Sequence, residues 1–198
     1  MCAKVLEALR ARFGAAVLET HSAFGDDTAV IDPARWRDVC QFLHDDPAMD
    51  FDLPVDLCGV DYPRRTPRME VVMHLYSVSR RHRIRLKARV GDDELAGCEI
   101  DSVTAIWSGM NWLEREVFDM SGVVFRGHPD LRRILMYPEF EGHPLRKDYP
   151  AQKTQPLIPY RTEEEAGLPL GKLPPFGPDE GMSFPRKVWP EQGRDEEN

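Results

Sequence analysis

Hydrophobic and polar residues alternate with a helical period in two stretches of the N-terminal half. Val5–Phe13 has the spacing of an amphipathic helix. A second helix is expected after Asp32 and Pro33, because Asp32 suits the N-cap and Pro33 the first turn. The apolar face of this helix would consist of Trp36, Val39, Cys40 and Leu43.

Other stretches have the composition and the period of β-strands. Val17–Ile31 is expected to form two short strands around a turn at Gly25-Asp26-Asp27. Phe51–Val60 and Glu70–Val78 are further predicted strands. Next comes a half-buried strand of an antiparallel pair, in which every second residue is apolar: Ile84, Leu86, Ala88 and Val90.

The opposite face of that strand is basic along its whole length. It carries Arg81, Arg83, Arg85, Lys87 and Arg89. Such a face is either solvated or in contact with an acidic partner surface, and the pattern leaves both interpretations open.

The segment Asp101–Gly122 is predicted to be helical. Asn111 and Glu114 have the spacing of a capping box, and Gly122 is placed to end the helix. One apolar stripe recurs at intervals of three and four residues: Ile106, Met110, Leu113, Val117 and Met120.

The composition changes from Ala151 onward. Eight prolines interrupt every possible element, yet apolar residues such as Phe176, Phe184 and Trp189 are dispersed among them. This pattern favours an extended arm that lays its side chains into grooves on another protein; the alternative is a disordered tail. The fold class is therefore predicted as α+β, with helices packed on a mostly antiparallel sheet and an extended Pro-rich C-terminal arm. The expected divisions are a globular domain over 1–125, a loop region over 126–150 and the arm over 151–198.

Composition and charge exclude several classes of protein. Hydrophobic residues make up 41% and charged residues 30% of 198 residues, enough for a packed core. The formal net charge of −8 disfavours a nucleic-acid partner. We find no apolar run long enough to span a bilayer, and the N-terminus lacks the apolar core of a signal peptide. Four cysteines, none in a CxxC pair, indicate free thiols in a reducing cytosol and match no iron–sulfur or zinc pattern: Cys2, Cys40, Cys58 and Cys98.

Acidic and histidine side chains gather between positions 114 and 150. Glu116 and Asp119 could form a carboxylate pair for acid–base catalysis or metal binding, but Arg115 can reach Asp119 and neutralise it. Two Gly-His-Pro turns, at Gly127-His128-Pro129 and Gly142-His143-Pro144, each precede paired cations. A free-standing metal-dependent hydrolase using His128, His143 and Glu116 is one hypothesis. Contact chemistry toward a partner is the interpretation we favour, because the spacing fits no ligand set.

These motifs carry a resemblance to a known family. The stretch Asn111-Trp112-Leu113-Glu114-Arg115-Glu116, then Asp119-Met120, Gly127–Leu135 and Gly142–Pro150, is similar to the C subunit of respiratory NADH–quinone oxidoreductase (complex I). The resemblance covers about Val5 to Pro150 and includes the basic alternating strand. One departure is Ser121, where the family usually has a large apolar residue; we expect a weaker packing contact there.

The resemblance implies a non-catalytic, cofactor-free assembly subunit of a proton-translocating enzyme complex. It would bind mainly the D subunit, with the B and I subunits nearby, in a hetero-oligomer close to the quinone module. FMN and iron–sulfur clusters would belong to other subunits. The chain would lie peripherally on the cytoplasmic side of the bacterial inner membrane. An alternative is the equivalent subunit of a membrane-bound hydrogenase or of a ferredoxin–quinone oxidoreductase.

The residues expected at the partner interface come from the motifs and from the arm. They are Glu114, Arg115, Glu116, Asp119, His128, Asp130, Arg132, Arg133, His143, Leu145, Arg146, Lys147, Asp148, Tyr149, Phe176, Phe184 and Trp189.

Overall fold

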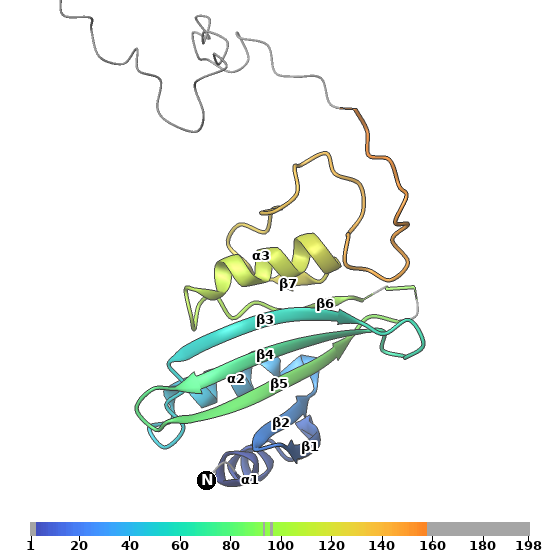
Figure 1. Ribbon diagram of the computed structural model, residues 1–198. Helices are drawn as coiled ribbons and strands as arrows, with labels where there is room; N and C mark the ends of the chain where they lie inside the picture. The colour runs from blue at the N-terminus through green and yellow to red at the C-terminus, as the bar shows by residue number, and fades with distance from the viewer. Residues whose placement is uncertain (1–2, 93, 96, 158–198) are drawn as a thin grey trace, which may run out of the picture. The chain divides into compact units, whose positions relative to one another are not determined.

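Five strands form one sheet in the order β1-β2-β5-β4-β3 (Figure 1). A computed structural model describes residues 3–92, 94–95 and 97–157, and those up to Pro156 form one compact unit. Neighbouring strands are antiparallel except β2 and β5, which run parallel. The strands are β1 (Val17–Ala23), β2 (Asp26–Ile31), β3 (Leu53–Asp61), β4 (Met69–Ser77) and β5 (His82–Val90). The predicted α+β class with a mostly antiparallel sheet is confirmed.

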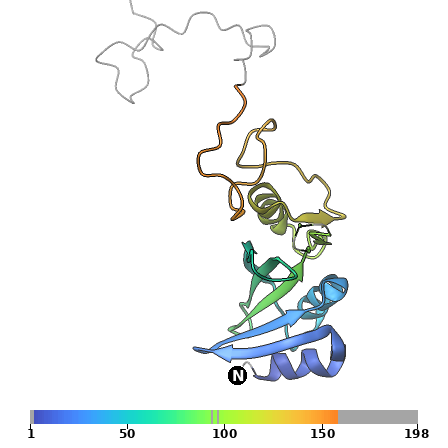
Figure 2. The ribbon, with the colours of Figure 1, turned by 90° about the vertical axis from the view of Figure 1, so that its right-hand side faces the viewer.

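Two helices supply the core on one face of this sheet. They are α1 (Ala3–Phe13), joined to β1 by a short 3-10 helix η1 (Gly14–Ala16), and α2 (Trp36–Asp45), preceded by η2 (Pro33–Arg35). The side chain of Asp32 accepts a hydrogen bond from the N–H of Ala34 at 3.0 Å, as its predicted capping role requires. The expected apolar face of α2 is fully buried. In Figures 1 and 2, α2 lies behind β4 and β5, so the other face of the sheet is turned toward the viewer of Figure 1.

A second, smaller layer follows the sheet, and here the predicted long helix is wrong. Residues 99–101 form strand β6 (Glu99–Asp101), which pairs in parallel with β7 (Val124–Arg126). The helix between them, α3, spans only Met110–Ser121, and no side chain caps its start. The capping box of Asn111 and Glu114 does not form, because Glu114 is drawn into the interior and binds the N–H of Val103 instead.

Two small residues allow α3 to pack closely against β3. A β-carbon added to Gly59 would lie 2.8 Å from the Oγ atom of Ser121 and 3.2 Å from a methyl group of Val117. Ser121 is itself buried. The residue that departs from the resembled family therefore lies at the contact between the sheet and the second layer.

The predicted C-terminal arm falls almost entirely outside the described residues. The described part of the chain reaches 157, so Phe176, Phe184 and Trp189 and their expected grooves lie beyond it. The divisions at 125 and 150 stay predictions.

Candidate functional site

The carboxylate of Asp119 organises the start of the loop that follows β7, residues 126–150, here named the signature loop. One oxygen, Oδ2, accepts the N–H groups of three successive residues, Ile134, Leu135 and Met136, at 3.1, 2.8 and 2.8 Å. The other, Oδ1, lies 2.6 Å from Nη1 of Arg133. A single side chain on α3 therefore fixes the backbone path of four loop residues.

This carboxylate is ionised although it is fully buried. Burial alone would raise the pKa of Asp119, but the three N–H groups and the Arg133 guanidinium stabilise the charged form. Together they lower the pKa of Asp119 below its usual range. Its charge is therefore used within the chain, whereas the sequence had suggested that Arg115 would neutralise it.

The second Gly-His-Pro turn closes the C-terminal end of α3, where helix carbonyls lack partners. The Nδ1 atom of His143 donates to the carbonyl of Asp119 at 2.9 Å, and Nε of Arg146 donates to the carbonyl of Ser121 at 2.8 Å. The N–H of Leu145 binds the carbonyl of Met120 at 2.9 Å. A guanidinium at this end also complements the helix dipole.

Gly122 makes this closure possible. It adopts a left-handed conformation, with φ of 81°, directly after α3. A β-carbon there would collide with the guanidinium of Arg146 and approach the ring of His143. The glycine thus both ends the helix and leaves room for the turn.

The first Gly-His-Pro turn is fixed to the same helix by neutral hydrogen bonds. Nδ1 of His128 accepts the N–H of Asp130 at 3.0 Å, and Nε2 donates to the carbonyl of Asn111 at 3.3 Å. Arg115 donates to the carbonyls of Arg132 and Arg133 at 3.1 and 3.2 Å. Both histidines of the metal hypothesis therefore use ring nitrogens to bind their own chain. Among the described residues, no group of three His, Cys, Asp or Glu side chains could hold a metal ion.

A buried ion pair attaches the signature loop to the sheet, and sequence reasoning missed it. Asp61, at the end of β3, accepts two hydrogen bonds from Arg68 at 2.7 and 2.8 Å and one from the N–H of Lys147 at 2.8 Å. Arg68 also lies 3.2 Å from a carboxylate oxygen of Asp148. The Arg68 hydrogen bonds are the main reason that the pKa of Asp61 is lowered.

The predicted interface residues thus divide into an internal and an external group. Glu114 and Asp119 are fully buried, and Arg115, Arg133, His128, His143 and Arg146 bind the chain's own backbone. The ring of Tyr149 stacks on Phe140. The exposed members are Glu116, Asp130, Arg132, Leu145, Lys147 and Asp148.

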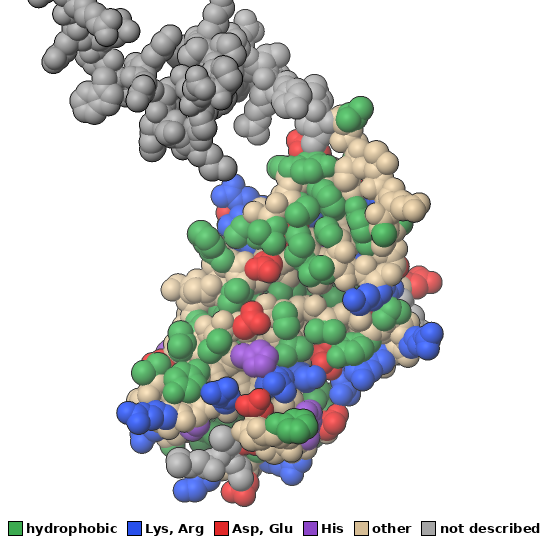
Figure 3. All heavy atoms as spheres, in the orientation of Figure 1, with side chains coloured by type: hydrophobic (Ala, Val, Ile, Leu, Met, Phe, Trp, Pro, Cys, Tyr) green, Lys and Arg blue, Asp and Glu red, His purple; other side chains and the backbone are tan. Residues whose placement is uncertain are grey.

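Large hydrophobic side chains also lie exposed in this region, and most of them were not predicted. Trp112 on α3 is 71% exposed, Leu135 57% and Leu145 58%, with Tyr137 also exposed. Figure 3 shows hydrophobic side chains gathered over α3 and the signature loop. Trp112 and Glu116 are separated by four residues, which places them on one face of the helix, and this spacing could have indicated them.

Glu114 is the one buried carboxyl of this site, among the described residues, that lacks a cation. Its Oε1 accepts the N–H of Val103 at 2.8 Å, while Oε2 has no hydrogen-bond partner among the described residues. Burial raises the pKa of Glu114 from 4.5 to about 7. This side chain is therefore largely protonated in the folded protein at pH values where an exposed glutamate is ionised.

The raised pKa of Glu114 predicts a pH-dependent effect of the Glu114→Gln substitution. In the parent, the contribution of this group is fully present below its ordinary pKa of 4.5 and is lost as the pH rises through about 7. Glutamine cannot ionise, so the variant should gain relative stability between about pH 5 and about pH 8, on the order of 3 kcal/mol. Urea unfolding at both pH values measures the difference. An equal difference at the two pH values would contradict the assignment.

The described part of the chain contains no helix long and apolar enough to cross a membrane.

Comparisons with known proteins agree on one family. The model of the family described as respiratory-chain NADH dehydrogenase, 30 Kd subunit, matches residues 29–155. The chain is 48% identical to the second C subunit of NADH-quinone oxidoreductase from Rhizobium etli (strain CIAT 652) over 139 residues, which are 70% of this chain and 72% of that protein. It is 51% identical to the C subunit of NADH-quinone oxidoreductase from Roseiflexus sp. (strain RS-1) over 148 residues, which are 75% and 83% of the two chains.

Two solved structures share the fold. The trypsin-resistant fragment of Nqo5 matches with a TM-score of 0.54 and 31% identity, over 65% of this chain and 98% of that one. A chain of the membrane-bound sulfane sulfur reductase, an archaeal respiratory membrane complex, matches with a TM-score of 0.64 over 76% and 86%. Its identity of 22% supports the fold alone.

Proposed function

The chain belongs to the family of the 30 Kd subunit of respiratory-chain NADH dehydrogenase, and from this premise we propose that it is a non-catalytic, cofactor-free assembly subunit. It is the C subunit of an NADH–quinone oxidoreductase, an enzyme complex of several subunits. In this proposal it binds the D subunit above all, with the B and I subunits, near the quinone module on the cytoplasmic side of the membrane. FMN and iron–sulfur clusters reside in other subunits.

One observation carries this proposal: the signature loop has a fixed backbone and an exposed apolar surface. The loop holds its shape through the chain's own carboxylates, arginines and histidines, as at Asp119 and His143. A preorganised surface binds a partner with a smaller loss of conformational entropy. Exposed tryptophan, leucine and tyrosine side chains are typical of the centre of a protein interface.

The exposed charges around this surface supply specificity. Arg132 is 73% exposed on its side chain and pairs only with exposed Asp130, at 2.9 Å, among the described residues. Lys147 and Glu116 are exposed as well. Charges at the rim of an interface mainly orient a partner and speed association, so these residues would select the partner while the apolar centre provides affinity.

The positions of the carboxylates support a structural role for them. Asp119 and Glu114 face the chain's own backbone and are shielded from solvent. A residue in general acid–base catalysis must reach the proton that it transfers. Substrate cannot reach either group without opening α3 away from the loop.

The alternative of a hydrogenase or ferredoxin-linked complex has weaker support. Its structural counterpart, the sulfane sulfur reductase chain, shares only 22% identity with this chain. The relatives at 44–51% identity are NADH–quinone oxidoreductase subunits.

The test of this proposal is a charge placed in the apolar surface. Leu145→Glu should leave the fold intact, because the Leu145 side chain is exposed and only its N–H binds α3. It should lower the yield of the complex co-purified with the tagged chain on the order of tenfold, since a buried unpaired charge costs several kcal/mol. Quantifying co-purified subunits and resolving the complex on native gels measures the loss.

Val78→Glu is the matched control. Val78 is 55% exposed, close to the 58% of Leu145, but lies in the turn between β4 and β5. The proposal predicts normal assembly for this variant. Assembly of Leu145→Glu at the level of Val78→Glu would contradict the proposed surface.

A further inference from the structure

The face of the sheet opposite α1 and α2 has an ordered arrangement of side chains that the proposed interface does not use. The antiparallel register aligns each cation of β5 with one residue of β4: Arg83 with Tyr76, Arg85 with His74, Lys87 with Val72 and Arg89 with Glu70. In β3, Leu53 lies next to Tyr76, and Asp56 next to His74. A band of Lys and Arg side chains is visible on this face in Figure 3.

The cations of this band are not equally neutralised. At one end, Lys87 lies 2.8 Å from Glu70, and Arg89 lies 3.0 Å from Glu19 and 3.5 Å from Glu70. Glu70 is almost fully buried beneath them. This end of the band is a closed ion-pair network that leaves little charge for a partner.

The other end of the band is open. Arg85 lies 3.8 Å from Asp26, a loose pair, and Arg83 has no carboxylate within ion-pair distance among the described residues. The unmatched positive charge of the sheet is therefore concentrated at Arg83. The alternation that predicted a basic face could not distinguish its two ends, because the neutralising carboxylates come from β1, β2 and β4.

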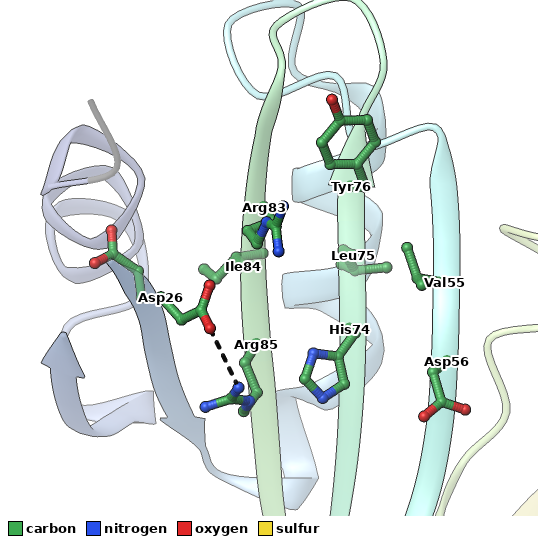
Figure 4. A pocket seen from close by; sticks show the side chains of 10 residues that line it. Asp26, Val55, Asp56, His74, Leu75, Tyr76, Arg83, Ile84 and Arg85 are labelled. Atoms are coloured by element: carbon green, nitrogen blue, oxygen red, sulfur yellow. Dashed lines mark ion pairs between the residues drawn. The ribbon is translucent and has the colours of Figure 1, made fainter. Parts of the chain in front are cut away.

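A groove of about 420 Å³ lies at this open end, between β2 and β3. Figure 4 shows Arg83 and Tyr76 at one end of it, His74 and Arg85 at the other, and Val55 along the β3 side. Val55 is 57% exposed, and Leu53, next to Tyr76 in the sheet, is also exposed. Apolar side chains and a free guanidinium thus share one concave site.

Polar groups of the groove wall also lack partners. The Oδ2 atom of Asp27, which lines the groove, is buried and has no hydrogen-bond partner among the described residues. A buried acceptor without a donor is uncommon in a finished interface. A bound chain with free backbone N–H groups would carry donors of the kind that this wall lacks.

We propose that this groove binds an acidic segment of a neighbouring subunit, with an aliphatic or aromatic side chain against Val55 and Tyr76 and a carboxylate on Arg83. The inference rests on the proposed function, because it requires an assembled complex. Charge complementarity selects this occupant. Asp26 is engaged by Arg85 and Asp56 is aligned with His74, so the guanidinium of Arg83 is the group that still needs a counter-ion.

A basic segment fits this site less well. It would have to place its cation beside Arg83 and Arg85, and like charges in a groove of low dielectric repel strongly. A purely apolar segment would bury the Arg83 guanidinium without a partner.

The experiment places a photocrosslinker in the groove of the complete complex. Tyr76→p-benzoylphenylalanine keeps an aromatic ring at this position, and mass spectrometry of the irradiated complex identifies the cross-linked segment. The expected product joins position 76 to another subunit within a segment that contains Asp or Glu beside an apolar residue. Adding Arg83→Glu should lower the cross-link yield on the order of tenfold.

Arg37→Glu is the matched control, because Arg37 is exposed on α2 and has no ion pair among the described residues. It should leave the cross-link yield unchanged. Three results would overturn the inference: assembly without any cross-link, a cross-link to a segment free of carboxylates, or an equal yield with Arg83→Glu. A chain that fails to co-purify with any other subunit, even without substitutions, would overturn the proposed function as well.

Discussion

Replacing Asp119 with alanine should dismantle the signature loop. The substitution removes the acceptor of three backbone N–H groups and the partner of Arg133 in one step. Removing one partner of a buried pair costs about 3–5 kcal/mol, and the stranded N–H groups add to this cost. We therefore expect the free energy of unfolding to fall by at least about 3 kcal/mol and the complex to be lost.

Urea unfolding of the full chain measures the change in stability, and amide hydrogen exchange at Ile134, Leu135 and Met136 measures the loop directly. Exchange at these three amides should accelerate far more than exchange in β4. Asp119→Asn retains an oxygen acceptor and should lie between the parent and the alanine variant.

Glu116→Gln is the control for the loss of a carboxylate on α3. Glu116 is exposed on the same helix, and we expect a change within about 0.5 kcal/mol. Protection of the three loop amides in Asp119→Ala at the parent level would show that other contacts hold the loop.

The sheet and the apolar faces of its elements could be predicted from the sequence because burial follows a simple period. In β5, Ile84, Leu86 and Ala88 are all buried, as the two-residue alternation requires. The face of α2 was predicted by the same logic with a helical period. Each of these decisions depends on residues a few positions apart.

The contacts of the site could not be predicted in this way because they join distant residues. Lys147 binds Asp61 across 86 positions of the chain, and His143 binds Asp119 across 24. Glu114 has capping-box spacing to Asn111, yet tertiary burial directs its carboxyl to Val103. Local spacing offered the wrong partner there because the competing donor lies in a turn before α3.

The two halves of the motif therefore have different physical roles. The carboxylates and histidines that resemble catalytic equipment bind the backbone of their own loop, as Asp119 and His128 do. The side chains left for a partner are simpler: tryptophan, leucine, lysine and a few rim carboxylates. A family motif of this kind specifies a rigid surface, and a substitution inside it should act on assembly through the shape of the loop.

The second large effect is expected from Asp61→Ala, which should separate the signature loop from the sheet. Arg68 is buried, with 9% of its side chain exposed, and would lose both hydrogen bonds to Asp61. Asp148 at 3.2 Å remains as a partial partner. We expect a loss of about 3–4 kcal/mol in the free energy of unfolding, because an uncompensated buried cation is costly.

The sign of the pH effect follows from the lowered pKa of Asp61. A group with a lowered folded-state pKa stabilises the protein above its ordinary pKa of 3.8 and loses that contribution as the pH falls through the folded-state value. The difference in stability between parent and Asp61→Ala should therefore be largest near neutral pH and shrink in acid. Urea unfolding at a series of pH values measures it.

The double variant Asp61→Leu/Arg68→Met separates charge pairing from packing. Replacing both members of a buried pair by apolar residues is often close to neutral, so this variant should recover much of the stability lost in Asp61→Ala. It should not restore the N–H contact of Lys147, so assembly should recover less than stability does. Asp56→Ala, on the same strand but exposed and without an ion pair among the described residues, should change stability by less than about 0.5 kcal/mol. Full stability of Asp61→Ala at neutral pH would mean that Asp148 alone satisfies Arg68 and that the loop is held by α3.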